Sequence, residues 1–399
     1  GTSVALTATA AAGSSFTGWS GGGCSGTGIC TVVMNADVSV NAAFITTGPE
    51  PLDTWNERDP GVYENLWAAA YGAGSFVAVG EGGIVVTSST GLSWTSRSAG
   101  TSNDLLGLAY LNGIFVAVGQ HDTILTSADG MSWSSHTATS AISAFDTTLY
   151  SVAHGNDRYV AVGKGSVVAT STNGAAWSLT SIPGPVDLYG VAYGSGTFVA
   201  VGPNGLIMTT TNGTSWEART SATSEKLWFV AFGGGLFVAV GENGTVLTSP
   251  NGADWTPRTS GIEGPLWSVT YGHNTFTAVG PYGAIITSPD GITWTKREAG
   301  TSLYLYGVGF GRETFMAVGE YGMVLQSDPL GSPSEYTLSV GKVGTGSGTV
   351  TSEPAGISCG SGCSAAYVPG TSVTLTAIPA AGSTFTGWSG GGCSGTGAC

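Results

Sequence analysis

The middle of the chain is a series of short, mostly apolar segments separated by tight turns. Its first complete set predicts strands at residues 67–71, 76–79, 84–87 and 93–97. No segment has the periodicity of an amphipathic helix. The last two strands of each set are joined by pairs that accept the positive φ of a hairpin: Thr90-Gly91, Asp129-Gly130, Asn173-Gly174, Asn212-Gly213, Asn251-Gly252 and Asp290-Gly291. The pattern predicts an all-β fold.

This set of four strands recurs at a fixed spacing. The glycine that closes the second strand returns every 39 residues, with one step of 44, at Gly80, Gly119, Gly163, Gly202, Gly241, Gly280 and Gly319. The Trp of the fourth strand has the same spacing but returns only six times, at Trp94, Trp133, Trp177, Trp216, Trp255 and Trp294. Repeats of this length with four strands each predict the blades of a β-propeller.

The missing seventh Trp strand has a candidate on the N-terminal side. Trp55 lies 39 residues before Trp94, and its context Thr-Trp-Asn-Glu-Arg resembles Ser93 to Arg97. An outer strand supplied from this side closes the ring and leaves no unpaired blade edge. We therefore predict a seven-bladed β-propeller over residues 52–331, in which Trp55 and the six repeat tryptophans are structural residues of the blades.

The turn motif resembles a known one. Ser288-Pro-Asp290-Gly291-Ile-Thr293-Trp294 is similar to the Asp-box of sialidase-like propellers, and more closely to its shortened form in photosystem-assembly-factor-like propellers. The resemblance covers about 280 residues. It implies that the motif shapes a turn and carries no chemistry.

The two ends of the chain contain nearly the same sequence. Residues 1–30 align with residues 370–399 at an offset of 369 without a gap, and 25 of the 30 positions are identical. Joining residues 336–399 to residues 31–44 gives one β-rich module of about 78 residues, of which each end holds the part that the other lacks.

This module resembles the divergent InlB B-repeats of bacterial surface proteins. The resemblance rests on Pro354-Ala-Gly-Ile-Ser-Cys359-Gly-Ser-Gly-Cys363, on residues 370–377, and on Phe385-Thr-Gly-Trp388-Ser-Gly. We expect residues 1–45 to be the C-terminal part of one module and residues 336–399 the N-terminal part of the next. Residues 46–51 and 332–335 are the expected linkers.

All six cysteines lie in these ends, in three close pairs: Cys24 with Cys30, Cys359 with Cys363, and Cys393 with Cys399. Close pairing of this kind indicates disulfides in an oxidising compartment. Zinc is the competing interpretation, although no His lies near these pairs to complete a four-ligand site.

The 369-residue recurrence indicates one unit of a longer polypeptide in which propellers and small modules alternate. Two other interpretations remain: an ordinary single gene product, and a polymer in which one chain's C-terminal part is completed by the next chain's N-terminal part.

Aromatic residues stand at the second position of most innermost strands: Trp67, Tyr150, Tyr189, Trp228, Trp267 and Tyr306, with Leu106 in the remaining blade. They are the candidate ligand-binding residues, since rings at the channel mouth can stack on sugars. The competing interpretation is packing between blades. The turns between second and third strands lie on the face of the blade-to-blade connections and vary most between repeats, at Glu81, His121, Lys164, Asn204, Glu242, Tyr282 and Glu320. Varied residues on a rigid frame favour binding, and a solvated rim is the competing interpretation.

Five arginines follow the motif Trp by three residues: Arg58, Arg97, Arg219, Arg258 and Arg297. Because outer strands are spread around the rim, these side chains cannot converge on one substrate, and we expect surface pairing or packing near the Trp rings. A sialidase-like nucleophilic Tyr with a Glu partner cannot be placed. The histidines, His121, His136, His154 and His273, have no metal-ligand spacing.

Charge and composition restrict the kinds of partner that the protein is expected to bind. The formal net charge of −14 disfavours nucleic acid and anionic lipid surfaces, and no apolar run reaches the length of a membrane span. We expect no cofactor, no metal and no enzymatic activity. The predicted function is an extracellular or surface structural and adhesive protein whose partners are neighbouring copies of itself and surface glycans or proteins. The alternatives are a lectin-like propeller displayed on spacers and a sialidase-like hydrolase.

Overall fold

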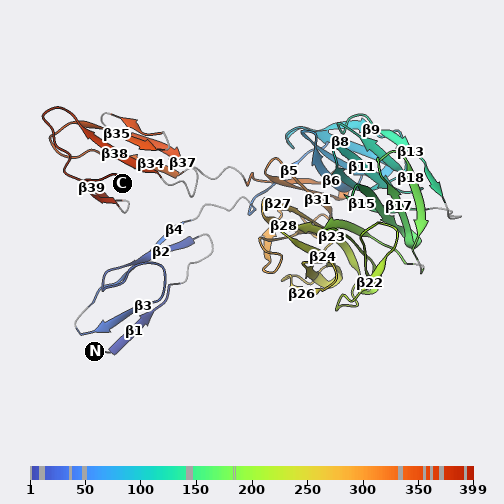
Figure 1. Ribbon diagram of the computed structural model, residues 1–399, viewed down its shortest axis with the longest axis horizontal. Coiled ribbons are helices and arrows are strands. Elements are labelled where there is room, and N and C mark those ends of the chain that lie inside the picture. The colour runs from blue at the N-terminus through green and yellow to red at the C-terminus, as the bar shows by residue number, and fades with distance from the viewer. Residues whose placement is uncertain are drawn as a thin grey trace. The chain divides into compact units, whose positions relative to one another are not determined.

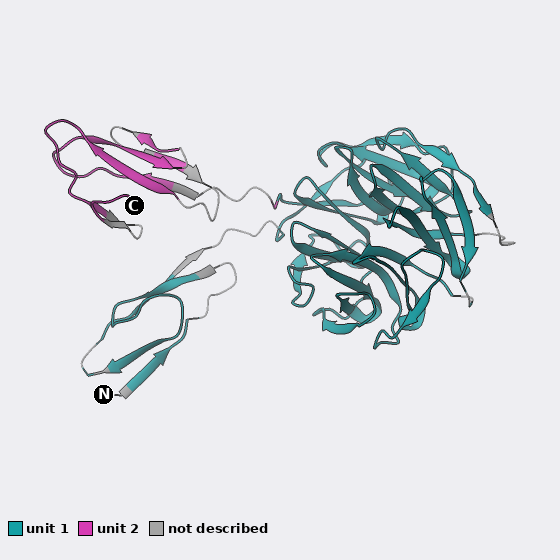
Figure 2. Ribbon diagram, in the orientation of Figure 1, with its two compact units in different colours: residues 1–329 teal, residues 330–399 magenta. Residues whose placement is uncertain are grey.

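The computed structural model describes residues 2–8, 14–35, 38–46, 52–140, 147–182, 184, 186–330, 336–353, 356–359, 363–367, 373–390 and 393–399. The chain divides into two compact units, residues 1–329 and 330–399, which are coloured separately in Figure 2. Both are built from strands, and the only helices among the described residues are single 3-10 turns. The all-β prediction is confirmed.

The propeller consists of seven sheets arranged around an axis (Figure 1). Blade 1 contains β6 (Leu66–Gly72), β7 (Ser75–Gly80), β8 (Ile84–Ser88) and β9 (Thr95–Ser98). Blade 2 contains β10 (Leu105–Leu111), β11 (Ile114–Gly119), β12 (Ile124–Ser127) and β13 (Ser134–His136). Blade 3 contains β15 (Leu149–Gly155), β16 (Arg158–Gly163), β17 (Val167–Ser171) and β18 (Trp177–Ser181). Blade 4 contains β19 (Gly190–Gly194), β20 (Thr197–Val201), β21 (Ile207–Thr210) and β22 (Glu217–Arg219). Blade 5 contains β23 (Leu227–Gly233), β24 (Leu236–Gly241), β25 (Thr245–Ser249) and β26 (Thr256–Thr259). Blade 6 contains β27 (Ser268–Gly272), β28 (Thr275–Val279), β29 (Ala284–Ser288) and β30 (Thr295–Glu298).

The seventh blade closes the ring as predicted. It contains β31 (Leu305–Gly311), β32 (Thr314–Gly319), β33 (Val324–Ser327) and, as its outer strand, β5 (Trp55–Arg58). β5 is antiparallel to β33, with Trp55 opposite Ser327 and Arg58 opposite Val324. The two ends of the propeller are therefore held in one sheet.

Five of the turns between second and third strands are 3-10 turns: η1 (Glu81–Gly83), η2 (Lys164–Ser166), η3 (Pro203–Gly205), η4 (Glu242–Gly244) and η5 (Glu320–Gly322). Blade 3 has a fifth strand, β14 (Ala138–Ser140), which pairs with β18 in parallel. This strand coincides with the single 44-residue step of the repeat.

The core lies in the second and third strands of each blade. A second-strand aromatic ring in every blade is at most 2% exposed: Phe76, Phe115, Tyr159, Phe198, Phe237, Phe276 and Phe315. The repeat position requires glycine because the backbone of a neighbouring segment approaches it closely. A Cβ on Gly80 would lie 2.0 Å from the carbonyl oxygen of Asn65, and the six equivalent glycines meet equivalent carbonyls at 1.9 to 2.4 Å.

The N-terminal part contains two antiparallel pairs. β1 (Thr2–Leu6) pairs with β3 (Cys30–Met34), and β2 (Ser14–Ser20) pairs with β4 (Asn41–Thr46). Cys24 and Cys30 form the predicted disulfide and are buried with Val32.

The described residues of the C-terminal unit form the strands β34 (Tyr336–Val340), β35 (Gly348–Glu353), β36 (Ser358–Cys359), β37 (Cys363–Tyr367), β38 (Thr374–Pro379), β39 (Trp388–Gly390) and β40 (Cys393–Gly395). Its small core is Val350, Ile357 and Leu375. Cys399 is disulfide-bonded. The side chains of Cys359, Cys363 and Cys393 lie outside the described ones, so their pairing remains a prediction, as do the domain boundaries within residues 331–335.

Candidate functional site

A cavity lies on the axis of the propeller. It has a volume of about 930 Å³ and is lined by the innermost strands of all seven blades, β6, β10, β15, β19, β23, β27 and β31. The predicted ligand-binding aromatics line this cavity together with Leu106. We call them the aromatic collar: Trp67, Tyr150, Tyr189, Trp228, Trp267 and Tyr306.

The collar consists of two arcs of rings in contact. In the first, the ring of Tyr306 lies 4.5 Å from that of Trp67 and 5.4 Å from that of Trp267, measured between centroids. In the second, Tyr189 lies 4.8 Å from Trp228 and 5.7 Å from Tyr150. All six residues are half-buried. The residues predicted as a set are therefore brought together, packed against one another and open to the channel.

Polar groups border the second arc. The Trp228 indole N–H donates to Glu242 Oε1 at 2.9 Å, and Lys226 Nζ lies 4.3 Å from the Trp228 ring centroid, a cation–π distance. Burial, followed by the nearby Asp187 carboxylate, raises the pKa of Tyr189. This side of the channel mouth thus combines ring faces with one cation and two carboxylates.

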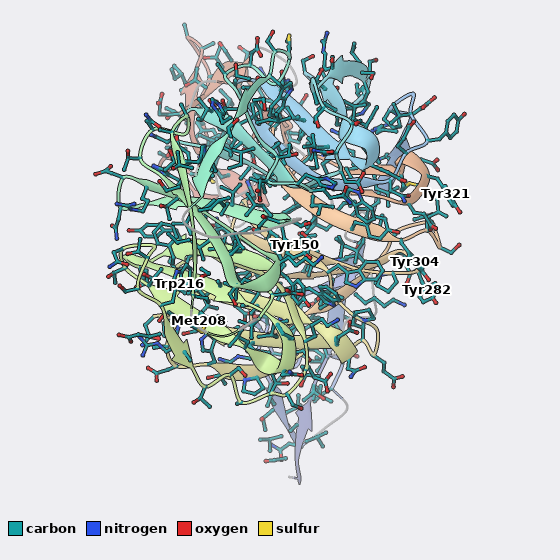
Figure 3. The ribbon with its side chains drawn as sticks, turned by 90° about the vertical axis from the view of Figure 1, so that its right-hand side faces the viewer. Tyr150, Met208, Trp216, Tyr282, Tyr304 and Tyr321 are labelled. Carbon is teal, nitrogen blue, oxygen red and sulfur yellow. A yellow bond between two sulfur atoms is a disulfide. The ribbon has the colours of Figure 1, made fainter. Side chains whose placement is uncertain are left out.

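The first arc extends toward the rim through tyrosines that the sequence pattern did not single out together. The Tyr304 ring lies 5.4 Å from Trp267 and 5.2 Å from Tyr282, edge-on in both cases. Tyr282 is 72% exposed and Tyr321 is 64% exposed. Figure 3 labels Tyr282, Tyr304 and Tyr321 on the same side of the propeller.

Lys226 and Tyr304 occupy one repeat position, which explains why sequence reasoning missed them. The residue just before the innermost strand's Leu is Asn65, Asp104, Thr148, Asp187, Lys226, Pro265 or Tyr304 in the seven blades. Asp104 Oδ1 accepts from Gly82 N, and Asp187 Oδ1 from Gly165 N, both at 2.8 Å. These carboxylates hold the turn of the preceding blade. The variation at this position between repeats is the sequence signal that could have identified Lys226 and Tyr304.

A second aromatic ring stands four residues further along each innermost strand, and in every blade but the sixth it lines the same cavity: Tyr71, Tyr110, His154, Tyr193, Phe232 and Phe310, with Tyr271 in the sixth blade. All of these rings except that of His154 pack on a glycine of the preceding blade, and a Cβ on Gly72 would lie 2.0 Å from Tyr110 Cγ. Burial lowers the pKa of His154. This second ring joins neighbouring blades.

The Asp-box turns form local hydrogen-bond caps. In blade 6, Asp290 Oδ1 accepts from the backbone N–H groups of Ile292 and Thr293 at 2.8 Å, and the Trp294 indole donates to the Gly291 carbonyl at 3.1 Å. The equivalent indole bond is made by Trp55, Trp94, Trp133, Trp177 and Trp255. The buried indole N–H groups of Trp216 and Trp67 have no partner within the described residues.

The rim arginines bind their own blades. Arg97, Arg219, Arg258 and Arg297 each donate through Nε to a Thr hydroxyl of the third strand at 2.8 to 3.0 Å. Arg58 donates to Gln326 Oε1 at 3.0 Å across the closing sheet. Each guanidinium is therefore positioned on its own outer strand.

The described residues hold neither a metal-binding cluster nor a membrane-spanning helix. They contain no group of three or more His, Cys, Asp or Glu side chains that could hold a metal ion. They also contain no helix with the length and apolar character that a bilayer crossing requires.

Similarity to known proteins divides the chain in the same way. The family described as the divergent InlB B-repeat domain matches residues 1–48 and 336–399. Comparison with curated proteins gives no match.

Solved structures match the propeller. They include YCF48 bound to D1 peptide (17% identity, TM-score 0.57, 68% of this chain and 94% of that chain). YCF48 from Cyanidioschyzon merolae also matches (16%, 0.56, 69% and 99%). A third is a catalytically inactive virginiamycin B lyase from Staphylococcus aureus with quinupristin (10%, 0.61, 68% and 98%). At these identities the likeness shows the fold alone. The chain thus consists of a seven-bladed β-propeller with regions similar to divergent InlB B-repeats at both ends.

Proposed function

We propose that this chain is a structural and adhesive protein of a bacterial surface, in which propellers are presented on β-rich spacer modules in a repeating array. The observation that carries the proposal is the match of both ends to a bacterial surface-type module, together with the 369-residue recurrence.

The disulfides support an extracellular setting. Cys24 and Cys30 are bonded, and Cys399 is in a disulfide as well. Such bonds form and persist in oxidising environments. In the N-terminal part, Cys24, Cys30 and Val32 are the buried apolar residues, so the bond substitutes for a core that so few residues cannot provide.

The array is tested in the bacterium that makes the protein. Antibodies to the propeller should detect a form well above the 39.9 kDa of this chain on a reducing denaturing gel. Protease added to intact cells should remove it. A single band near this mass, protected from protease, contradicts the proposal.

A specific observation favours a second candidate, a lectin-like propeller. The aromatic collar opens into the axial cavity, and aromatic faces beside a few polar groups are suited to the apolar faces of sugars. Because the chain carries a formal net charge of −14, the ligand of this candidate is a neutral rather than a sialylated or sulfated glycan. The peptide in the YCF48 structure makes a protein ligand the competing outcome.

A glycan array probed with the whole chain tests this candidate. Neutral glycans should bind, and Trp228→Ala or Trp267→Ala should weaken binding at least tenfold. The control is Leu92→Ala, an exposed apolar side chain in a blade 1 turn, which should bind as the parent does. Absence of glycan binding, or unchanged binding by both collar variants, refutes the candidate and leaves the collar as blade packing.

The sialidase-like alternative has the least support. The arginines that such an enzyme would direct at a carboxylate each bind their own blade, as Arg97 does with Thr87. We therefore propose a binding and structural role without catalysis.

A further inference from the structure

The segment that the two ends share makes the same Trp and Phe contacts in both copies. Trp19 donates its indole N–H to the Gly28 carbonyl at 2.8 Å, and the equivalent Trp388 donates to Gly397 at 2.7 Å. Each indole also contacts an equivalent Phe ring, edge-on, with centroids 5.1 Å apart. Because these contacts are equivalent, we expect a strand that pairs with the segment in the N-terminal part to be able to pair with the segment in the C-terminal unit.

In the N-terminal part, two strands follow the shared segment and pair with it. β3 lies against β1 with Leu6 opposite Cys30 and Val4 opposite Val32, and β4 lies against β2. Val32 is 5% exposed. Residues 31–46 thus cover one side of the shared segment.

The C-terminal unit begins the same pairing. Leu375 and Cys399, the equivalents of Leu6 and Cys30, exchange two backbone hydrogen bonds, at 2.6 Å from the Leu375 N–H and 3.0 Å from the Cys399 N–H. Along its opposite edge β38 pairs with β35. In an antiparallel ladder hydrogen-bonded pairs alternate, so the next N–H directed at the Cys399 side belongs to Val373, the equivalent of Val4. Within the described residues, no strand pairs with it there.

Among the described residues, the opposite side of the shared segment is covered in the C-terminal unit and not in the N-terminal part. There Leu375 is 6% exposed and packs with Val350 and Ile357. Its equivalent Leu6 is half-buried, and Val4 is 40% exposed. The two ends therefore cover complementary sides of the same segment.

We propose that residues 31–46 of a neighbouring copy of this unit complete the C-terminal module, adding the equivalents of β3 and β4 beside β38 and residues 383–389. The junction between successive units is then one module with strands from both. This inference deepens the array part of the proposed function and rests on it for its setting, whereas the strand pairing itself is testable on one chain.

The test appends a second copy of residues 31–46 directly after Cys399 of the whole chain. The matched control appends the same residues in scrambled order. The readout is amide hydrogen exchange at Val373, with Val4 as the internal reference, because Val4 already faces Val32. We expect exchange at Val373 to slow at least tenfold with the native segment and to remain unchanged with the scrambled one.

A further variant replaces the appended equivalent of Val32 with Asp, which introduces a charge at a buried position and should abolish the protection. Unchanged exchange at Val373 with the native segment overturns the inference. That outcome is distinguishable from failure of the array, which is read from the mass of the bacterial protein. Protection without any larger native form would leave the strand fit in place and remove its array setting.

Discussion

Replacing Trp55 with Ala tests whether the closing strand β5 stabilises blade 7 as strongly as an outer strand that is continuous in sequence with its blade. Trp55 is 8% exposed and donates its indole N–H to the Leu52 carbonyl at 3.0 Å. Trp255, in blade 5, is also 8% exposed and makes the equivalent bond to Gly252 at 2.9 Å. The two side chains are matched in burial and bonding, but Trp255 is continuous in sequence with its blade and Trp55 is not.

Truncating a buried Trp to Ala costs about 3–5 kcal/mol. A domain of this size loses roughly 2–4 °C in melting temperature per kcal/mol, so each variant should melt about 6–20 °C lower. Thermal unfolding followed by circular dichroism, on both variants and the parent, gives the comparison. If Trp55→Ala shifts the melting temperature by less than a third of the Trp255→Ala shift, β5 is a loosely docked arm and ring closure does not stabilise the propeller.

The other predictions concern blade packing, acid stability and the disulfide. Gly72→Ala should lower the melting temperature by several degrees, because its Cβ would lie 2.0 Å from Tyr110 Cγ; Gly264→Ala, with no atom within 4 Å, should have little effect. Backbone hydrogen bonds lower the folded-state pKa of Asp290, so its stabilisation is present above the unfolded pKa of about 3.9 and is lost as the pH falls further. Asp290→Asn should therefore weaken the pH dependence of melting below about pH 4, and a parent-like profile would refute the capping role. Cys24→Ser with Cys30→Ser should destabilise the N-terminal part by about 2 kcal/mol while the propeller transition stays in place; calorimetry separates the two.

The repeat allowed the number of blades and the closing strand to be predicted from the sequence. Gly80 and its equivalents mark a fixed close approach between strands, so their spacing counts the blades directly. Trp55 was recognisable as the closing residue because its neighbours match those of Trp94. β14 was not predictable, because its parallel pairing with β18 depends on an insertion that occurs in blade 3 alone.

The candidate site was predictable only in part. The six collar aromatics share one repeat position, and the structure places them around one cavity. Lys226 and Tyr304 escaped notice because their shared position holds a different residue in almost every blade, and in two blades a carboxylate there binds a neighbouring turn. A repeat therefore predicts the blades and the residues that share a repeat position, whereas candidate site residues at a position that varies between blades escape it.

Electron microscopy of material released from the surface of the producing bacterium tests the central claim most directly. The account predicts propeller discs, labelled by antibodies to residues 52–331, at regular intervals along filaments, each pair separated by one small module. Labelled discs that are always single, without a neighbouring copy, would contradict it.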